Sequence, residues 1–240
     1  LANDSEPFSL SFYENEIVSI TGLIGSGKTA LASQIFGLNP DPNVTMTLNG
    51  NSYSPQSPEH AISAGVFMCP KDRASNAVVS EFDISNNLAL PFFKRHSRLS
   101  FIRNKSLTQN ARNSINELGI VCQSEMDSVT TLSGGNQQKV MVGRWLAEDS
   151  SVLLLDEPFQ GVDIKARRDI GHQIRSTSRQ RATIIFVAEL DEALEIADRV
   201  IVLHEGNLVG DYQNESKNIP KIVSSFSGSA NNLDSTNYGT

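Results

Sequence analysis

Eight consecutive residues near the amino end of the chain have the composition of a phosphate-binding loop. They are Gly22, Leu23, Ile24, Gly25, Ser26, Gly27, Lys28 and Thr29. Glycines let backbone N–H groups curl around phosphate oxygens, and a helix beginning at Lys28 adds its positive end. We expect the Lys28 ammonium on the β- and γ-phosphates and the Thr29 hydroxyl on Mg²⁺. The spacing therefore predicts a site for a nucleoside triphosphate.

Two adjacent carboxylates follow an aliphatic run much later in the chain. The run is Val152–Leu155, and Asp156 and Glu157 come directly after it. A buried strand would deliver both acids at its carboxyl end, where ligands bind in open α/β sheets. We expect Asp156 to hold Mg²⁺ through water and Glu157 to orient or deprotonate the attacking water. Two solvated acids at the end of a strand would give the same pattern. The pair therefore indicates a catalytic magnesium site only in combination with Lys28.

A second candidate anion site precedes these acids. Ser133, Gly134 and Gly135 would open a helix, whose first N–H groups can bind an anion. The plainer alternative is that Ser133 only caps that helix. Two anion sites in one chain make sense if a nucleotide is held between two such domains.

The elements that must position these residues alternate between strand and helix. Expected strands are Ile17–Thr21, Val152–Leu155, Thr183–Val187 and Val200–Leu203, and expected helices are Thr29–Phe36, 165–180 and Leu190–Ala197. Thr45–Gly50 is expected in an antiparallel hairpin. Helical spacing of apolar residues recurs through Leu107–Leu118 and Val140–Leu146. The pattern predicts an α/β fold with a mostly parallel sheet, an antiparallel β subdomain and an inserted α-helical subdomain.

Composition narrows the function classes. The chain has 240 residues, 39% hydrophobic, and a formal net charge of −7, which argues against a general nucleic-acid binder. Cys69 and Cys122 do not form a Cys-x-x-Cys pair and are expected to be reduced. The scattered histidines lack zinc-ligand spacing, and no apolar run is long enough to span a bilayer. Ser224–Thr240 is poor in apolar residues and is expected to be disordered.

Taken together, the three motifs resemble the ATPase domain of ATP-binding cassette (ABC) proteins, a P-loop NTPase fold of the RecA-like type. Leu132–Lys139 resembles the ABC signature, Arg144–Ala147 matches the pattern after it, and Gly161–Asp163 resembles the D-loop. The resemblance implies ATP and Mg²⁺ as cofactors, with hydrolysis of ATP to ADP and phosphate. It also implies that a nucleotide held by the glycine loop of a second cassette is contacted by Ser133, Gly134, Gly135 and Gln137. Asp163 would communicate across the dimer.

Further segments resemble one subfamily over most of residues 8–215. Ser57–Ile62, Pro70–Arg73 and Ile84–Leu88 are similar to the second, C-terminal cassette of fused monosaccharide importers of the ribose, galactose and autoinducer-2 type. The resemblance implies a second cassette, transmembrane permease subunits and, indirectly, an extracytoplasmic solute-binding protein as partners. The protein would then be peripheral on the cytoplasmic face of the cell membrane. The start without Met suggests a fragment of a longer polypeptide.

This resemblance divides the chain into segments. Residues 1–82 and 148–215 would be the ATP-binding core with the β subdomain, 83–147 the helical signature subdomain, and 216–240 a C-terminal segment. A basic cluster at Lys94–Arg98 and 103–105 would be a solvated face or a contact with the permease.

Two residues depart from the family pattern. Lys71 occupies the place of the usual glutamine between core and helical subdomain, and Ala188 the place of the switch histidine. Alanine can neither donate to a γ-phosphate nor orient water, and lysine has no amide oxygen for Mg²⁺. The hypothesis is that this cassette binds MgATP and hydrolyses it slowly. Alternatives are a soluble, non-transport ABC ATPase and a regulatory half with little turnover.

Overall fold

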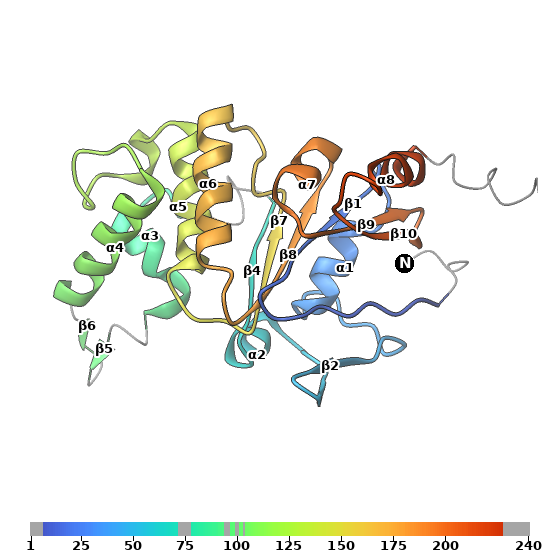
Figure 1. The fold of residues 1–240 in the computed structure, drawn as a ribbon. Coiled ribbons are helices and arrows are strands. Elements are labelled where there is room, and N and C mark those ends of the chain that lie inside the picture. The colour runs from blue at the N-terminus through green and yellow to red at the C-terminus, as the bar shows by residue number, and fades with distance from the viewer. Residues whose placement is uncertain (1–6, 72–77, 94–96, 99–100, 103, 228–240) are drawn as a thin grey trace, which may run out of the picture. The chain divides into compact units, whose positions relative to one another are not determined.

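The computed structural model describes residues 7–71, 78–93, 97–98, 101–102 and 104–227 (Figure 1). The chain divides into two compact units. The first unit contains Leu1–Phe67, Ser151–Asp156 and Gln180–Thr240, and the second contains Met68–Ser150 and Glu157–Arg179.

The first unit is built on a twisted sheet. Its elements, in chain order, are β1 (Ile17–Thr21), α1 (Lys28–Ile35), β2 (Met46–Leu48), β3 (Asn51–Tyr53), α2 (Pro58–Ser63), β7 (Val152–Asp156), β8 (Ala182–Val187), α7 (Leu190–Ile196), β9 (Arg199–His204), β10 (Asn207–Gln213) and α8 (Ile219–Phe226). A further strand, β4 (Val66–Cys69), begins in this unit. The six-stranded sheet has the order β10-β9-β1-β8-β7-β4.

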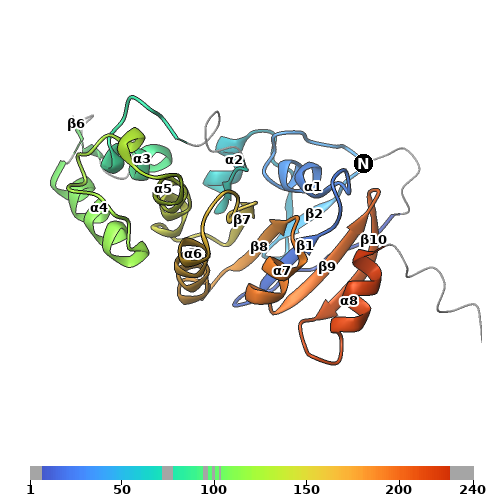
Figure 2. The same ribbon diagram turned by 90° about the horizontal axis from the view of Figure 1, so that it is seen from above.

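The direction of the strands confirms the predicted fold class. β1 pairs in parallel with β8 and β9, β7 pairs in parallel with β8, and β10 pairs antiparallel with β9. β2 and β3 form the separate antiparallel hairpin expected around Thr45–Gly50. In Figure 2, α1 lies on one side of the sheet and α7 and α8 lie on the other.

Apolar strands explain why the sheet forms here. All five residues of β1 and all six of β8 are buried, as expected for central parallel strands covered on both faces. β-Branched residues dominate both strands and pack well on a pleated surface.

Some elements differ from the sequence-based expectation. The helix expected over 165–180 ends at Ser176, because the Thr177 and Ser178 hydroxyls donate to the carbonyls of Gln173 and Arg175 and close the last turn. Part of the stretch Ser224–Thr240 is also ordered: α8 continues through Phe226, because Ile222 and Ser225 are buried. Residues 228–240 lie outside the described residues.

The second unit is mainly helical. Its elements are α3 (Ile84–Ala89), η2 (Leu90–Phe92), β5 (Ser97–Arg98), β6 (Phe101–Ile102), α4 (Asn104–Leu118), η3 (Val129–Thr131), α5 (Gly134–Leu146) and α6 (Ile164–Ser176). α5 contacts α3, α4 and α6. Trp145 is buried, and its ring meets the Phe92 ring edge-on, with 5.8 Å between the ring centroids. The side chains of the basic cluster around 94–105 are outside the described part.

A buried guanidinium ties two helices of the second unit together. Arg144 Nε donates to the Asn87 carbonyl at 2.6 Å, and its Nη2 donates to Asn87 Oδ1 at 3.3 Å. Burial lowers the pKa of Arg144 to about 10. None of the helices described is both long and apolar enough to cross a membrane.

In the first unit, an arginine clamp holds the segment before β1 against the sheet. Arg199 donates to the Glu16 carboxylate at 2.8 Å, to Asp211 at 2.9 Å and to the Ser11 carbonyl at 2.5 Å. Its side chain is 9% exposed. Two segments of the chain, the stretch before β1 and β10, therefore converge on one cation of β9.

We expect Arg199→Ala to lower the free energy of unfolding by about 2–4 kcal/mol, because it leaves two partly buried carboxylates without their cation. Chemical denaturation measures this loss. The control is Lys217→Ala, whose ion pair with Glu215 is exposed (76% and 54%) and should contribute less than about 1 kcal/mol. Equal losses in the two variants would contradict a special role for the clamp.

Candidate functional site

The glycine loop connects β1 to α1, as predicted, and its conformation depends on glycine. Gly25 and Gly27 have φ of 86° and 96°, in the left-handed region that side chains rarely adopt. Gly27 is the N-cap of α1, and it supplies no side-chain oxygen to the first turn of that helix. The N-terminal end of α1 therefore faces the loop without a side-chain cap, as an anion site requires.

Lys28 is drawn into the loop rather than extended into solvent. It is 8% exposed, and its Nζ donates to the Gly22 carbonyl at 2.5 Å. Ser26 is also buried, and its Oγ has no hydrogen-bond partner within the described residues. Thr29 is exposed at the first turn of α1, while Leu23 and Ile24 are 52% and 99% exposed. The loop thus combines a positive charge, a hydroxyl and a helix N-terminus.

Gly22 is the most constrained position of the loop. Its φ is 153°, and a Cβ there would lie 2.1 Å from the Leu203 carbonyl oxygen and 2.9 Å from Ser26 Oγ. The collision with backbone of β9 leaves no room for any side chain. The loop therefore approaches a neighbouring strand closely enough to exclude every residue except glycine.

We expect Gly22→Ala to lower the free energy of unfolding by about 2–4 kcal/mol and to weaken triphosphate binding more than tenfold. Denaturation and equilibrium dialysis measure the two effects. Gly50→Ala is the matched control, because Gly50 has a φ of 78° but nothing within 4 Å of an added Cβ. That variant should lose only about 1–2 kcal/mol, from the backbone conformation alone. If Gly22→Ala lost no more free energy of unfolding than Gly50→Ala, the close approach of the loop to β9 would be disproved.

Asp156 lies at the same edge of the sheet as the loop. It ends β7, is 2% exposed and pairs with Phe186 of β8, while Thr21, just before the loop, pairs with Val187 of β8. The carboxyl ends of β1 and β7 are therefore one strand apart, with the end of β8 between them. The glycine loop and Asp156 both lie at the carboxyl ends of parallel strands, which is where ligands bind in open α/β sheets.

Glu157 follows Asp156 with a strained backbone. Its φ is 50°, an uncommon value for a residue other than glycine, and its carbonyl accepts from Gln160 N in a turn. It is 8% exposed. Such strain is concentrated at functional positions, where the surrounding structure must hold it.

The residues at this edge fit MgATP as a ligand. Lys28 and the uncapped α1 suit a polyphosphate, and Thr29 and Asp156 supply one hydroxyl and one carboxylate. The described residues contain no cluster of three or more His, Cys, Asp and Glu side chains able to hold a metal alone. Mg²⁺ needs no such cluster, because it commonly binds through one or two carboxylates together with substrate phosphates.

Ala188 and Glu189 come directly after β8, between the loop and Asp156 in strand order. Ala188 is half-buried and Glu189 is exposed. Ala188 thus supplies only a methyl group at this edge of the sheet. Lys71 lies in the second unit, exposed, two residues beyond β4.

The signature residues lie together in the second unit. Ser133 is the exposed N-cap of α5 and accepts from Asn136 N, and Gly134 and Gly135 form the first turn. A Cβ on Gly135 would lie 3.4 Å from Ala166 Cβ, so α6 packs closely on this turn. Asp163 caps α6 by accepting from Ala166 N at 2.8 Å.

The Gln137 side chain makes hydrogen bonds to the backbone just before the signature helix, which the sequence did not predict. Its Nε2 donates to the carbonyls of Val129 and Leu132, at 3.2 and 3.3 Å. These bonds hold the turn that precedes Ser133.

Three side chains near the signature were missed by sequence reasoning. Gln138 Nε2 donates to the Pro158 carbonyl at 2.9 Å, and Lys139 Nζ donates to Asp169 at 2.7 Å and to the Gly119 carbonyl at 3.0 Å. Asn136 Nδ2 donates to Ser133 Oγ at 2.9 Å. The sequence shows these polar residues within Leu132–Lys139, but the partners of Gln138 and Lys139 are 20 to 30 positions away in the chain and have no sequence signal.

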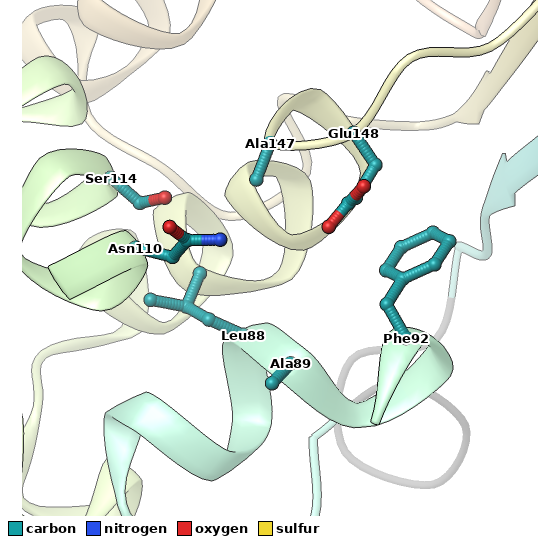
Figure 3. A pocket seen from close by; sticks show the side chains of 7 residues that line it. All are labelled: Leu88, Ala89, Phe92, Asn110, Ser114, Ala147 and Glu148. Atoms are coloured by element: carbon teal, nitrogen blue, oxygen red, sulfur yellow. The ribbon is translucent and has the colours of Figure 1, made fainter. Parts of the chain in front are cut away.

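A small hollow in the second unit is not a nucleotide site. Figure 3 shows it among α3, η2, α4 and the end of α5. Its volume is about 10 Å³, enough for a single water molecule. The lining residues are Leu88, Ala89, Phe92, Asn110, Ser114, Ala147 and Glu148.

Comparison with known proteins identifies the family of the chain. The sequence matches the ABC transporter family profile over residues 5–160. It is 34% identical over 218 residues to the arabinose import ATP-binding protein AraG of Pectobacterium atrosepticum, covering 90% of this chain and 43% of that protein. It is 36% identical over 210 residues to the xylose import ATP-binding protein XylG of Thermoanaerobacter pseudethanolicus, covering 87% of this chain and 42% of that protein.

The fold also has solved counterparts. A nucleotide-free ATP-binding cassette from an ABC transporter matches with a TM-score of 0.77 at 19% identity, over 92% of this chain and 88% of that one. The chain belongs to the ABC transporter family and has the fold of its ATP-binding cassette. It spans about two fifths of the length of the importer relatives that it matches.

Proposed function

We propose that this chain is the ATP-binding and ATP-hydrolysing cassette of an importer for a monosaccharide or similar small solute. The observation that carries the proposal is the glycine loop and Asp156 at one edge of a parallel sheet, one strand apart. The arabinose and xylose import proteins that the chain resembles support the solute class. Residues 1–82 and 148–215 would act as the ATP-binding core, 83–147 as the signature subdomain, and 216–240 as a C-terminal extension.

Each site residue has a separate task in this proposal. Lys28 and the N-H groups of Gly22–Thr29 hold the phosphates and stabilise the charge that develops as the γ-phosphoryl group leaves. Thr29 and Asp156 would hold Mg²⁺, which would neutralise charge on the phosphates. Glu157 orients the attacking water or takes its proton.

The signature would act on a second nucleotide. The ATP held by the glycine loop of a partner cassette would be contacted by Ser133, Gly134, Gly135 and Gln137. Asp163 would couple the two cassettes. Closure of this ATP sandwich would drive separate transmembrane permease subunits, fed by an extracytoplasmic solute-binding protein. The chain would work at the cytoplasmic face of the membrane, as the second cassette of the complex.

Two experiments separate this proposal from its rivals. Single-turnover cleavage of ATP, with and without the partner cassette, distinguishes an enzyme from a regulatory half that only senses ATP. Co-purification with membrane permease subunits distinguishes a transporter from a soluble, non-transport ABC ATPase. A chain that binds no MgATP, or a complex without a permease, would contradict the proposal.

We propose further that turnover at this cassette is slow, because Ala188 and Lys71 replace the residues that would assist hydrolysis. We expect Ala188→His to raise the single-turnover rate about tenfold, since an imidazole can donate to the γ-phosphate and orient water. Ala64→His, at another half-buried alanine of the first unit, is the control and should leave the rate unchanged. An unchanged rate in Ala188→His, or a wild-type rate equal to that of the partner cassette, would count against slow turnover.

A further inference from the structure

Asn136, on the first turn of α5, makes two side-chain hydrogen bonds of opposite kinds. Its Oδ1 accepts from the backbone N–H of Val121 at 3.0 Å, fifteen positions earlier in the chain. Its Nδ2 donates to Ser133 Oγ at 2.9 Å, one helical turn away. The amide thus connects the signature serine to a backbone segment outside the helix.

The Val121 bond determines which end of the amide faces Ser133. A backbone N–H can only donate, so it must meet the oxygen of the Asn136 amide, and the nitrogen then points to Ser133. Ser133 Oγ consequently accepts this bond, in addition to a longer one of 3.4 Å from Asn136 N. The two acceptor positions of the hydroxyl are both directed at Asn136.

The hydrogen of the Ser133 hydroxyl must therefore point elsewhere. A serine hydroxyl has one donor hydrogen and two acceptor positions, so a hydroxyl that accepts twice remains able to donate once. Ser133 is exposed, so a ligand in solvent can reach this hydrogen. An O–H donor of this kind is the group needed to bind a phosphate oxygen.

We propose that Asn136 is a positioning residue that sets the Ser133 hydroxyl as a hydrogen-bond donor toward a phosphate. The inference rests on the proposed function, in which Ser133 faces ATP on a partner cassette. Asn136 itself need not touch the nucleotide. Lys139 supports the arrangement, because it holds the carbonyl of Gly119, two residues before Val121, from the same helix.

Two variants of Asn136 separate positioning from simple anchoring. Asn136→Asp keeps an oxygen for Val121 N–H but removes the donor to Ser133, so the serine hydrogen turns toward the new carboxylate. Asn136→Ala removes both bonds, and Val121 N–H can bond to water because Val121 is 75% exposed. If Asn136 served only to anchor the Val121 segment, Asn136→Asp would behave as wild type.

The experiment measures ATP turnover of the complete protein and the MgATP affinity of this chain. We expect both variants to lower kcat about tenfold to a hundredfold, the usual effect of losing one donor to a charged group. The affinity of this chain's own loop for MgATP should not change. Asn113→Ala is the control, because Asn113 also accepts an amide bond, from Gln109 at 3.0 Å on the exposed face of α4, and should leave kcat unchanged.

A double-mutant cycle tests whether Asn136 acts through Ser133. In a Ser133→Ala background, we expect Asn136→Ala to cause no further loss, because no hydroxyl remains to be positioned. Hydrogen exchange at Val121 should be slow in wild type and Asn136→Asp and fast in Asn136→Ala.

The outcomes distinguish this inference from the proposed function. A wild-type protein with no ATPase activity overturns the proposed function and the inference with it. Two other outcomes overturn the positioning role alone. One is an active wild type whose kcat is not changed by Asn136→Asp. The other is a loss of kcat from Asn136→Ala that is as large in the Ser133→Ala background as in the wild type.

Discussion

Lys28→Ala should weaken the binding of MgATP by at least about a hundredfold and abolish measurable hydrolysis. The Lys28 side chain is nearly buried in the loop, and its ammonium already donates to the Gly22 carbonyl. Hydrogen bonds to a charged phosphate in such a setting are about twice as strong as neutral ones, and the lost cation also removes its attraction to the triphosphate. Isothermal titration calorimetry with MgATP measures the change directly.

The control for this variant is Lys221→Ala, because Lys221 is an exposed lysine on α8 of the same unit. It alters net charge equally but lies away from the loop in the sequence, and its MgATP affinity should match the wild type. Circular dichroism must show that both variants are folded. Unchanged affinity in folded Lys28→Ala would remove the basis for a phosphate site.

Glu157→Gln should separate binding from chemistry. The amide cannot take a proton from water, so we expect kcat to fall about a hundredfold to ten-thousandfold, within the range of general acid–base effects. MgATP affinity should remain within about threefold, because Lys28, Thr29 and Asp156 are unchanged. Rapid-quench measurement of ATP cleavage at saturating nucleotide gives the rate of the chemical step.

Glu205→Gln is a closely matched control for this substitution. Glu205 also has a left-handed backbone, with a φ of 49° against 50° for Glu157, and it lies in the turn between β9 and β10. Any effect of placing glutamine at such a backbone position should therefore appear in both variants. Equal turnover in Glu157→Gln and Glu205→Gln would assign the chemistry to another group.

Much of the first unit could be predicted because its signals are local. The run Ile17–Thr21 is continuous and apolar, and the glycines directly after it can only be a turn, so strand, loop and helix follow in order. The same holds for Val152–Leu155, a fully aliphatic run that is followed directly by Asp156 and Glu157. Periodicity also indicated the helices that became α4 and α5.

Weakly patterned elements were not predicted. β10 contains Gly210 and Asp211 and has no run of β-branched residues, and it exists because it pairs with β9 and because Asp211 binds Arg199. α8 was missed because its buried face is short, with Ile222 and Ser225 inside and Ile219 and Val223 partly exposed. Both elements depend on a neighbour that is formed by a different part of the chain.

The sequence by itself determined the class of chemistry, because a triphosphate site requires particular residue types at short spacings. Gly22, Gly25, Gly27, Lys28 and Thr29 are within one strand-to-helix turn, and their order alone indicates phosphate binding. Only the tertiary structure decided which side chains support the motifs. The bonds from Asn136 to Val121 and from Lys139 to Gly119 and Asp169 join residues far apart in sequence, and hydrogen bonds of this kind depend on packing that no local pattern encodes.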